Sequence, residues 1–318
     1  MKVSVIIPVF NNAHCVSTAL NSIINQKGII KEIIVVDDGS EDNLDEVIEE
    51  FSDEVIFLKQ DNKGPAAARN AGLLAATGDF IAFLDADDFW EPTFLDETTS
   101  FLQNNTECVA VSTGARFLYS ENQSLVRPRA MVERKLPERP FVVKNFFSFW
   151  YEHDHIFTGT CLLRQPVIKN AGLMREDLRI AEDLEYWGLI ATYGWWGFIP
   201  KVLWNCNSQD ASSKGGWVKK NKVRWRNTPD LDSWGQRIEK RIEKNQLPYF
   251  KKYKGGLALS FVYNMILGLE FGRALDTFRQ RKTSMPSSRP KKVYNLTSKT
   301  WITWYFMSLV IYIREVLK

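Results

Sequence analysis

The first 84 residues alternate between two apolar periodicities, and this alternation constrains the fold more than any other feature. Short apolar runs typical of buried strands cover 3–10, 32–37, 55–59 and 80–84, and helical patterns cover 13–25, 44–51 and 65–76. Pro65 in the first turn and Gly78 just past the last turn mark the ends of the third helix. Strands that take turns with helices predict an α/β fold with a doubly wound, mainly parallel sheet.

Polar residues follow three of the predicted strands. The first strand ends at PVFNN (8–12), the second at DDGS (37–40) and the fourth at DADD (85–88). Ligands of doubly wound sheets bind outside the carboxyl ends of the strands, so these residues are expected to converge on one site. Taken alone, DDGS also fits the acid pair of a phospho-acceptor receiver domain or an ordinary turn.

Three carboxylates directly follow the apolar fourth strand. Asp85, Asp87 and Asp88 repel one another and lose hydration near a core, so a positive group is expected to offset them. If extended backbone continues through Ala86, Asp85 and Asp87 point to the same side and suit Mg²⁺ or Mn²⁺ bound to a diphosphate. The alternative is that Asp87 or Asp88 caps a helix beginning near Pro92.

Four motifs in order give the chain a resemblance to a known family. VSVIIPVFNN, IIVVDDGS with an acid two residues on, NKGPAAARNAGLLAATGDFIAFLDADD and AEDLEYWGLI resemble the inverting family 2 glycosyltransferases, over about residues 2–205. The resemblance implies the GT-A (Rossmann-like) fold. It also implies transfer of a sugar, with inversion, from a nucleotide diphosphate donor, usually UDP-linked, to an acceptor hydroxyl. The enzyme class that the resemblance implies is a hexosyl- or N-acetylhexosaminyl-transferase.

The resemblance assigns donor-site roles to individual residues. The nucleotide-sugar-binding set is Pro8, Val9, Phe10, Asp38, Arg69, Asp85 and Ala86. Asp38 would accept a hydrogen bond from the uracil ring, and Arg69 would moderate the repulsion among the acids. Asp85 would face the ribose or the sugar. Asp87 would bind the divalent cofactor, Mn²⁺ or Mg²⁺, directly, and Asp88 would support it or cap a helix.

The acid pair at residues 182–183 supplies the remaining chemistry. Asp183 matches the family's base, which takes the proton of the acceptor hydroxyl. It precedes the helical pattern LEYWGLIATYG, and the positive end of a helix dipole favours the ionised carboxylate. Taken alone, the pair fits a helix N-terminal cap better than a catalytic base, and only the order of the motifs favours the base. Glu182 is a weaker candidate for acceptor binding.

The stretch FTGTCLLRQPVIKNAGLM (157–174) resembles the acceptor side of the family. It predicts a strand, an arginine and a short helix ending at Gly172, with Thr160 and Arg164 as candidate acceptor contacts. His153 and His155, just before it, are expected to form a surface pair or an acceptor contact, with no metal.

One loop departs from the family pattern. Many members close over the diphosphate with a Y-R-x-H-x-x-S sequence, whereas LWNCNSQDASSKGGW (203–217) has neither arginine nor histidine. Ser212, Ser213 and Lys214 are expected to supply part of this closure from a flexible lid.

The charge distribution separates two regions. Residues 1–125 carry a net charge of −14 and the remainder +17. We predict a catalytic domain over 1–215 and a helical region over 216–318 that associates with a membrane or with another subunit. Two apolar runs, 257–271 and 301–313, are shorter than the roughly 20 residues that span a bilayer. They either lie in a membrane interface near an anionic leaflet or pack as ordinary helices on the core or a second copy.

Partners and location follow from the same features. The expected partners are a UDP-sugar donor and a glycan or polyprenyl-linked saccharide acceptor, with no nucleic acid, although the Trp- and Lys-rich stretch 217–226 resembles nucleic-acid-binding surface. Four dispersed cysteines and no signal-peptide pattern predict a cytoplasmic protein, peripheral at the cytoplasmic face of a membrane.

Two alternative functions remain open. A sugar nucleotidyltransferase should carry a Gly-rich phosphate loop after the first strand, yet PVFNNAHC has no glycine. A sugar-nucleotide-binding protein without turnover would keep the cleft residues and fits the altered 203–217 loop.

Overall fold

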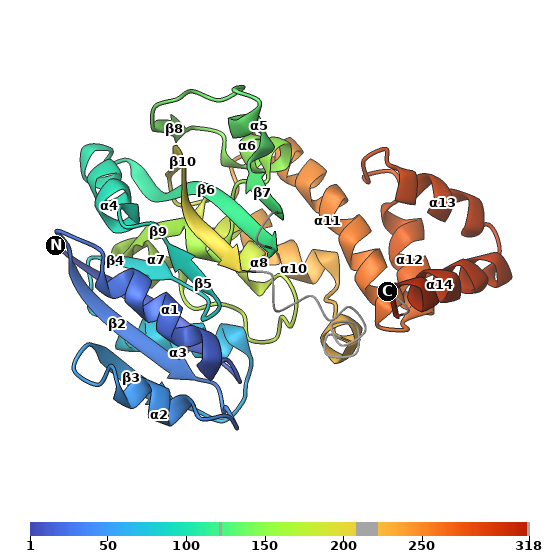
Figure 1. Ribbon diagram of the computed structural model, residues 1–318. Helices are drawn as coiled ribbons and strands as arrows, with labels where there is room; N and C mark the ends of the chain where they lie inside the picture. The colour runs from blue at the N-terminus through green and yellow to red at the C-terminus, as the bar shows by residue number, and fades with distance from the viewer. Residues whose placement is uncertain (121–122, 208–221, 317–318) are drawn as a thin grey trace. The chain divides into compact units, whose positions relative to one another are not determined.

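The computed structural model describes residues 1–120, 123–207 and 222–316, which belong to two compact units (Figure 1). The N-terminal unit comprises Met1–Glu176 and Glu182–Gln209, and the C-terminal unit comprises Asp177–Ala181 and Asp210–Lys318. The domain boundary predicted after residue 215, and the lid residues Ser212, Ser213 and Lys214, lie outside the described residues.

The first seven elements confirm the predicted alternation of strands and helices. They are β1 (Lys2–Val9), α1 (Ala13–Ile24), β2 (Ile30–Asp37), α2 (Leu44–Glu49), β3 (Val55–Lys59), α3 (Pro65–Ala75) and β4 (Phe80–Phe83). Pro65 occupies the first turn of α3, where its missing N–H leaves no helical hydrogen bond unmade. The helices therefore begin and end close to the residues that the sequence marks.

The rest of the N-terminal unit mixes strands and helices. Its elements are β5 (Asp88–Trp90), α4 (Phe94–Asn104), β6 (Cys108–Ser120), β7 (Gln123–Arg127), α5 (Arg129–Val132), β8 (Phe141–Val143), α6 (Phe146–His153), the 3-10 helix η1 (Thr158–Thr160), β9 (Cys161–Arg164), α7 (Gln165–Ala171), α8 (Glu182–Ile190) and β10 (Trp195–Asn207). The strand, arginine and short helix expected over 157–174 correspond to β9, Arg164 and α7, and α7 ends at Gly172 as expected.

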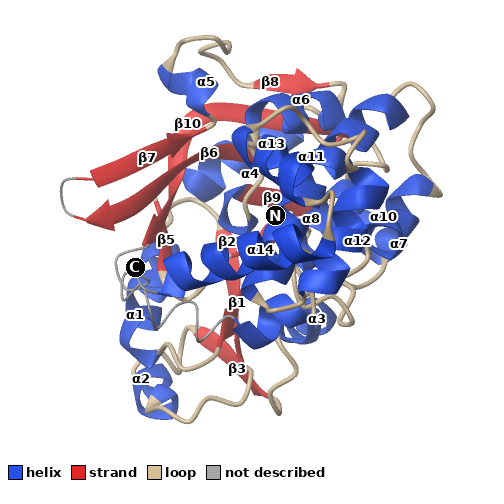
Figure 2. Ribbon diagram, turned by 90° about the vertical axis from the view of Figure 1, so that its right-hand side faces the viewer, coloured by secondary structure: helices blue, strands red, loops and turns tan. Residues whose placement is uncertain are grey.

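One sheet joins the described strands in the order β3-β2-β1-β4-β9-β6-β10-β5, with β7 on β6 and β8 on β10 (Figure 2). Strands β3, β2, β1 and β4 run parallel to one another, and β6 runs parallel to β10. Strand β9 is antiparallel to both β4 and β6. The predicted α/β fold with a mainly parallel sheet is confirmed, with antiparallel strands added in the half that follows β4.

Strand β1 is buried on both faces, which explains its continuous apolar run. Val5 and Ile7 share a buried cluster with Val16 of α1. On the other face Ile6 meets α3, because a Cβ added at Gly72 would lie 2.4 Å from Ile6 Cγ2. Only glycine allows α3 to approach the sheet this closely. The register of α3 against β1 is thereby fixed, and α3 carries the arginine of the candidate site.

The carboxyl ends of β1, β2 and β4 lie at one edge of the sheet. In the parallel registers, Val9 of β1 is opposite Asp37 of β2, and Ile6 is opposite Phe83 of β4. The chain runs from β1 through β2 to β3 on one side, and β4 then adds on the other side of β1. This reversal is the switch point at which doubly wound sheets bind ligands.

The C-terminal unit is helical, as predicted for this region. Its described helices include α10 (Leu231–Glu239), α11 (Leu247–Leu267), α12 (Phe271–Arg281), α13 (Arg289–Thr297) and α14 (Trp301–Val316). Trp304 lies in an aromatic cluster, with ring centroids 5.7 Å from Phe278 and 5.5 Å from Tyr294. Its Nε1 donates a hydrogen bond of 2.9 Å to Phe271 O. This cluster holds α12, α13 and α14 together.

The apolar run 257–271 belongs to the core of the C-terminal unit. Its buried members are Ala258, Phe261, Val262, Met265, Ile266, Leu267 and Phe271. Of the two interpretations given for this run, the packed helix is the one that the structure favours. Among the described residues, no helix combines the length and the apolar character needed to cross a membrane.

Candidate functional site

Arg69 of α3 lies between two acidic segments that are about a hundred residues apart in the chain. Its Nη2 donates a hydrogen bond of 2.8 Å to Asp85 Oδ1, and its Nη1 lies 3.6 Å from Glu182 Oε1. Burial alone would lower the pKa of Arg69, but the charges of Asp85, Glu182 and Asp183 raise it above its ordinary value. The structure thus brings three predicted site residues, Asp85, Glu182 and Asp183, around the guanidinium of a fourth, Arg69.

The guanidinium of Arg69 keeps donors that the protein does not use. The side chain is only 6% exposed, yet Nε and Nη1 have no hydrogen-bond acceptor among the described residues. Unmet donors on a buried charged group are costly. They suit an anionic oxygen of a ligand, because the guanidinium fork matches phosphate and carboxylate geometry.

Asp183 lies in the first turn of α8, as predicted. Its Oδ1 accepts a hydrogen bond of 2.8 Å from the backbone N–H of Leu184, and its Oδ2 accepts one of 3.1 Å from Thr158 Oγ1. One oxygen therefore accepts from the N–H of the next residue within α8, and the other is held by a hydroxyl. Ala181, two residues earlier, has a φ of 58°, an unfavourable value for alanine that is typical of constrained sites.

Asp85 and Asp87 are separated by a turn. Asp88 N donates to Asp85 O across 3.1 Å, so the chain reverses at Ala86 and Asp87. The extended backbone required to place Asp85 and Asp87 on the same side does not continue through Ala86, and that expectation is wrong. The apolar strand ends before the carboxylates because the chain must turn out of the sheet at this edge.

Asp88 begins β5 instead of capping a helix. Its Oδ1 accepts a hydrogen bond of 3.2 Å from Asn207 N, whereas α4 begins at Phe94 after Thr93, without a capping side chain. The capping alternative for this cluster is therefore wrong. Asp88 is 3% exposed, and burial followed by the charges of Asp85 and Asp87 raises its pKa well above the usual range.

The carboxylates after β4 suit a cation shared with a ligand. The described residues contain no group of three or more His, Cys, Asp or Glu side chains that could hold a metal ion by themselves. Mg²⁺ and Mn²⁺ bound to diphosphates commonly take only one or two protein carboxylates and keep water and phosphate oxygens as the remaining ligands. After burial, the negative charges of Asp85 and Asp87 are what raise the pKa of Asp88. A bound cation would offset these charges. The carboxylate of Asp87 therefore fits this kind of metal site, in which water and phosphate oxygens supply the other ligands.

Asp38 is held against the turn that leads into α3. Its Oδ1 accepts hydrogen bonds from Gln60 Nε2 at 2.7 Å and Lys63 N at 2.9 Å, and its Oδ2 accepts one of 2.8 Å from Gly64 N. A carboxylate accepts about four hydrogen bonds, so one position remains for a donor from outside the protein. Sequence reasoning did not identify Lys63 and Gly64, because a backbone donor leaves no residue signature. It also missed Gln60, whose side-chain amide donates from the position directly after β3.

The end of β1 lies beside Asp38. Asp38 N donates to Val9 O across 2.8 Å, and Phe10 directly follows the strand with its side chain 45% exposed. Pro8 is partly buried, and Asn11 N donates to Ser40 Oγ across 3.0 Å. The predicted base-contacting residues thus lie at neighbouring strand ends, where Phe10 leaves an aromatic face open to solvent.

Asn70, the neighbour of Arg69, was not among the predicted site residues. Its Oδ1 accepts a hydrogen bond of 2.9 Å from Met174 N, and its Nδ2 donates to Glu176 Oε1 at 2.9 Å. Asn70 thereby ties α3 to the segment before α8. Within the motif A-R-N, Asn70 therefore anchors the segment before α8, and Arg69 pairs with the acids on either side of it.

Two acceptor candidates make other contacts in the fold. Arg164 is opposite Phe80 at the amino end of β4, and its Nε donates to Cys108 O at 2.8 Å, so it lies at the edge of the sheet opposite Asp85. Thr160 is fully buried and donates to Phe157 O at 2.7 Å. Both expectations are corrected. Arg164 lies at the far edge because β9 runs antiparallel to β4. The hydroxyl of Thr160 is buried and already bonded within its own turn, to Phe157 O.

The expected surface histidine pair is also corrected. His155 is fully buried among Phe146, Phe149 and Phe198, with ring centroids 5.7, 4.5 and 5.8 Å away. Its ring nitrogens have no hydrogen-bond partner among the described residues. Burial lowers the pKa of His155 well below its usual value, and the neighbouring His153 lowers it further.

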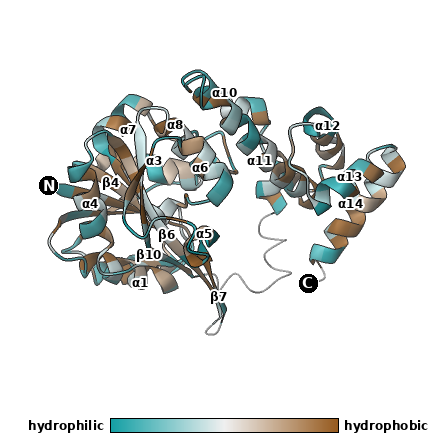
Figure 3. Cartoon of the chain, turned by 90° about the horizontal axis from the view of Figure 1, so that it is seen from above, coloured by the Kyte–Doolittle hydropathy of each residue, from teal (hydrophilic) through white to brown (hydrophobic). Residues whose placement is uncertain are grey.

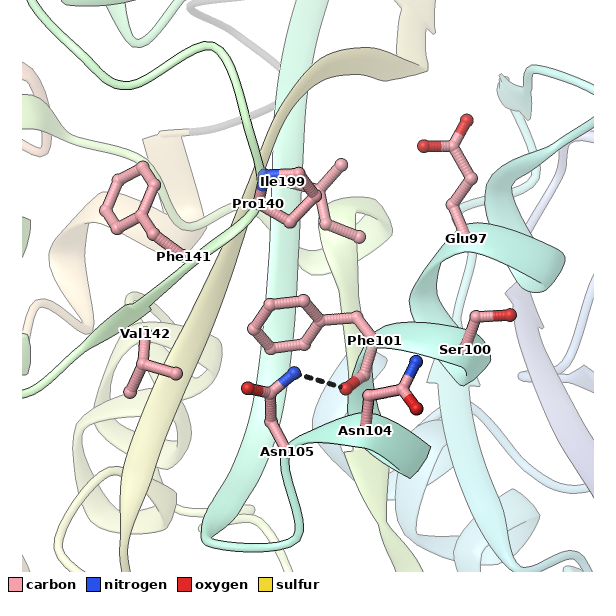
Figure 4. A pocket seen from close by; sticks show the side chains of 9 residues that line it. All are labelled: Glu97, Ser100, Phe101, Asn104, Asn105, Pro140, Phe141, Val142 and Ile199. Atoms are coloured by element: carbon pink, nitrogen blue, oxygen red, sulfur yellow. Dashed lines mark hydrogen bonds between the residues drawn. The ribbon is translucent and has the colours of Figure 1, made fainter.

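A pocket of about 580 Å³ lies between α4, β8 and β10 and contains none of the predicted site residues (Figure 4). Its lining residues are Glu97, Ser100, Phe101, Asn104, Asn105, Pro140, Phe141, Val142 and Ile199. Asn105 Nδ2 donates to Phe101 O at 2.8 Å within the pocket wall. Asn105 O accepts from Arg164 at 3.3 Å, which places the pocket at the far edge of the sheet with Arg164.

Comparison with solved structures identifies the fold. Staphylococcus aureus TarS, residues 1–349 in complex with UDP-GlcNAc, aligns with a TM-score of 0.61 at 18% identity, covering 99% of this chain and 89% of that one. The mannosyltransferase PcManGT of Pyrobaculum calidifontis, in complex with GDP-Man and Mn²⁺, aligns with a TM-score of 0.55 at 18% identity, covering 99% and 86%. At such identities the likeness establishes the GT-A fold.

Sequence comparison identifies the family. An uncharacterized glycosyltransferase of Nostoc sp. is 44% identical over 109 residues, which cover 33% of this chain and 34% of that protein. The chain spans about a third of the length of the first curated relatives that it matches. The model of the family described as "Glycosyl transferase family 2" matches residues 4–171, more than half of the chain. The chain therefore belongs to glycosyl transferase family 2.

Proposed function

We propose that this protein is an inverting glycosyltransferase that moves a sugar from a nucleoside diphosphate donor to an acceptor hydroxyl, with Asp183 as the base. One observation carries the proposal. Arg69 is bound to Asp85 on one side and lies beside Glu182 on the other, and it keeps two buried nitrogens without acceptors. The segment expected to hold the donor and the segment expected to activate the acceptor therefore meet at one cation suited to phosphate oxygens.

The proposed reaction is a direct displacement at the anomeric carbon. The acceptor oxygen forms the new bond to that carbon as its proton moves to Asp183, and the bond from the carbon to the diphosphate oxygen breaks, so that the diphosphate leaves with the electron pair. The carbon inverts because attack and departure occur on opposite faces. The hydrogen bond from Thr158 and the N-terminal end of α8 would keep Asp183 oriented and ionised before the transfer.

Arg69 and a cation bound by the carboxylates after β4 would stabilise the negative charge of the leaving diphosphate. Arg69 would donate its unused N–H groups to the donor or its leaving diphosphate. Asp87, with Asp85 beside it, would hold Mn²⁺ or Mg²⁺. When bound, this cation supplies positive charge that stabilises the departing diphosphate. The Mn²⁺ and GDP-Man in the mannosyltransferase PcManGT structure, which has the same fold, support the metal assignment.

The donor that we propose is a UDP-sugar. Asp38 keeps one acceptor position for a uracil N–H, and the TarS structure of the same fold holds UDP-GlcNAc. We further propose a glycan or a polyprenyl-linked saccharide as the acceptor. Cys15, Cys108, Cys161 and Cys206 form no disulfide in the described part of the chain, which supports a reducing compartment, the cytoplasm, as the location of this protein.

The test is donor turnover by the purified full chain with Mn²⁺. A panel of UDP-sugars and GDP-mannose is first screened for protection against thermal unfolding, because a ligand selective for the native state raises stability with its concentration. The selected donor is then assayed for release of UDP or GDP, alone and with glycan acceptors, with Asp183→Asn as the control. Release that requires Asp183 supports the proposal. Protection without release under any condition contradicts the enzyme and favours the binding protein without turnover.

A further inference from the structure

The last helix, α14, exposes a continuous apolar face. Its exposed residues with large apolar side chains are Trp301, Ile302, Tyr305, Phe306, Leu309, Val310, Ile313 and Val316. They recur every three or four positions and therefore form one stripe along the helix. Ile302 is 81% exposed and Phe306 is 68% exposed. In Figure 3, α14 is mainly brown, the colour of hydrophobic residues.

The opposite face of α14 is already used for packing. Trp304 is fully buried against Phe278 and Tyr294, and Met307 and Ser308 are buried beside it. Within the stripe, Tyr305 also packs on Phe271, with ring centroids 5.0 Å apart, whereas Ile302 and Phe306 remain mostly exposed. A helix that is apolar on both sides normally has both sides covered, and a continuous exposed apolar patch marks an interaction site.

The segment around this face is strongly basic. Residues 277–314 contain eight Lys and Arg and no Asp or Glu. The exposed basic residues are Arg279, Lys282, Arg289, Lys292, Lys299 and Arg314. Lys299 lies just before α14 and Arg314 lies in its last turn. Arg314 is ion-paired with Glu315 at 2.6 Å, so Lys299 is the cation beside the stripe that can reach past the apolar surface to anionic groups.

We propose that the exposed face of α14 docks on an anionic lipid surface, with the helix lying in the plane of the interface. Sixteen residues make a helix of roughly 24 Å, shorter than the bilayer core, so α14 fits along the surface and does not span it. Trp301 and Tyr305 are the side-chain types that favour the headgroup region. Basic residues beside an apolar stripe are the features that bind such helices to anionic membranes.

The charge also argues against a second copy as the occupant. In a two-fold contact the same patch of each copy meets its mate, so two segments of net charge +8 would face each other. Like charges at an interface weaken association, whereas anionic headgroups complement them. The lipid proposal does not depend on the proposed transferase activity, because its surface shares no residue with the candidate site.

The experiment measures flotation of the full chain with vesicles of phosphatidylcholine alone or mixed with equal parts of phosphatidylglycerol. We expect binding to the anionic vesicles that weakens as salt is added, because salt screens the lysines and arginines. The double variant Ile302→Ser with Phe306→Ser should bind at least about tenfold more weakly, since each side chain would lose its burial in lipid. Lys292→Gln and Lys299→Gln should each weaken binding about fivefold.

The matched control is Leu74→Ser with Val132→Ser, which removes two equally exposed apolar side chains from the N-terminal unit. These substitutions should leave vesicle binding unchanged. Circular dichroism checks that each variant keeps its helices. Absence of wild-type binding to anionic vesicles, or unchanged binding of the Ile302 and Phe306 variant, overturns the proposal. So does a lipid-free dimer in light scattering that the same two substitutions dissociate, since that result assigns the face to a second copy.

Discussion

The guanidinium of Arg69 donates a hydrogen bond of 2.8 Å to the carboxylate of Asp85. The Asp85 side chain is 38% exposed, whereas that of Arg69 is 6% exposed, so the pair lies where the buried α3 meets an accessible loop. Glu182, with a side chain 3% exposed, lies on the other side of the guanidinium. One cation therefore compensates an accessible acid and a buried acid at once.

Replacing Arg69 by methionine is expected to destabilise the fold, chiefly through Glu182. Removing one partner of a buried ion pair leaves an uncompensated charge, at a cost of about 3 kcal/mol in the free energy of unfolding. Urea unfolding of Arg69→Met, Glu182→Gln and the double variant measures the coupling between the two residues. The double variant should be more stable than Arg69→Met alone. Equal stabilities would contradict the charge pairing.

Asp183→Asn is expected to leave donor affinity nearly intact and to lower transfer by about 10²- to 10⁴-fold, the usual contribution of a general base. The amide oxygen can still accept one of the two hydrogen bonds that the carboxylate accepts from Leu184 N and Thr158, so the local structure should persist. Donor affinity is measured by titration calorimetry and transfer by release of nucleotide. Thr158→Val is the matched variant, with a smaller loss, because it removes an orienting bond and keeps the carboxylate. An Asn variant with full activity would remove the assignment of Asp183 as base.

Asp87→Ala is expected to abolish the metal-dependent part of UDP binding. Wild-type protein should bind UDP more tightly with Mn²⁺ than with EDTA, because the cation offsets both the diphosphate and the carboxylates after β4. In Asp87→Ala the affinities with Mn²⁺ and with EDTA should converge. Asp53→Ala removes an exposed acid elsewhere and should keep the wild-type difference. A wild-type affinity that does not change with EDTA would argue against the metal.

The sequence predicted the donor half of the site better than the acceptor half. Strand ends could be located from apolar runs, and parallel pairing brings such ends to one edge, so the strands that precede Asp38 and Asp85 were correctly expected to end at the same edge. The prediction for Arg164 was wrong because β9 is antiparallel to β4. The sequence does not give the direction of a strand in the sheet, so it could not show which edge Arg164 would reach. Thr158 was missed because a hydroxyl that orients a carboxylate has no spacing rule.

Tertiary packing decided the other differences. The turn at Ala86 and Asp87 depends on β5 pairing with β10, a contact between residues far apart in the chain. The sequence EHDHIF contains His155 among polar neighbours, and only the packing of α6 against β10 surrounds it with phenylalanines. The two apolar runs near the C-terminus look alike as sequences. Their difference, one buried and one half exposed, arises from how the helices of the C-terminal unit pack.

Acidification is expected to destabilise the protein through His155. Burial among aromatic rings lowers the folded-state pKa of His155 well below 6.5, with a smaller contribution from His153. As the pH falls below about 6.5, the unfolded chain takes up a proton that the folded chain excludes, so the free energy of unfolding falls by up to about 1.4 kcal/mol per pH unit. The stabilising effect of the neutral ring is therefore complete above this pH and is lost below it. Urea unfolding of the wild type and of His155→Phe between pH 7 and pH 5.5 isolates this contribution, because Asp88, whose raised pKa gives a slope of the opposite sign, is present in both. The free energy of unfolding should fall less with acidification in His155→Phe than in the wild type, whereas His14→Gln, at an exposed position of α1, should keep the wild-type slope. Equal slopes for the wild type and His155→Phe would show that His155 can be protonated without leaving its aromatic surroundings.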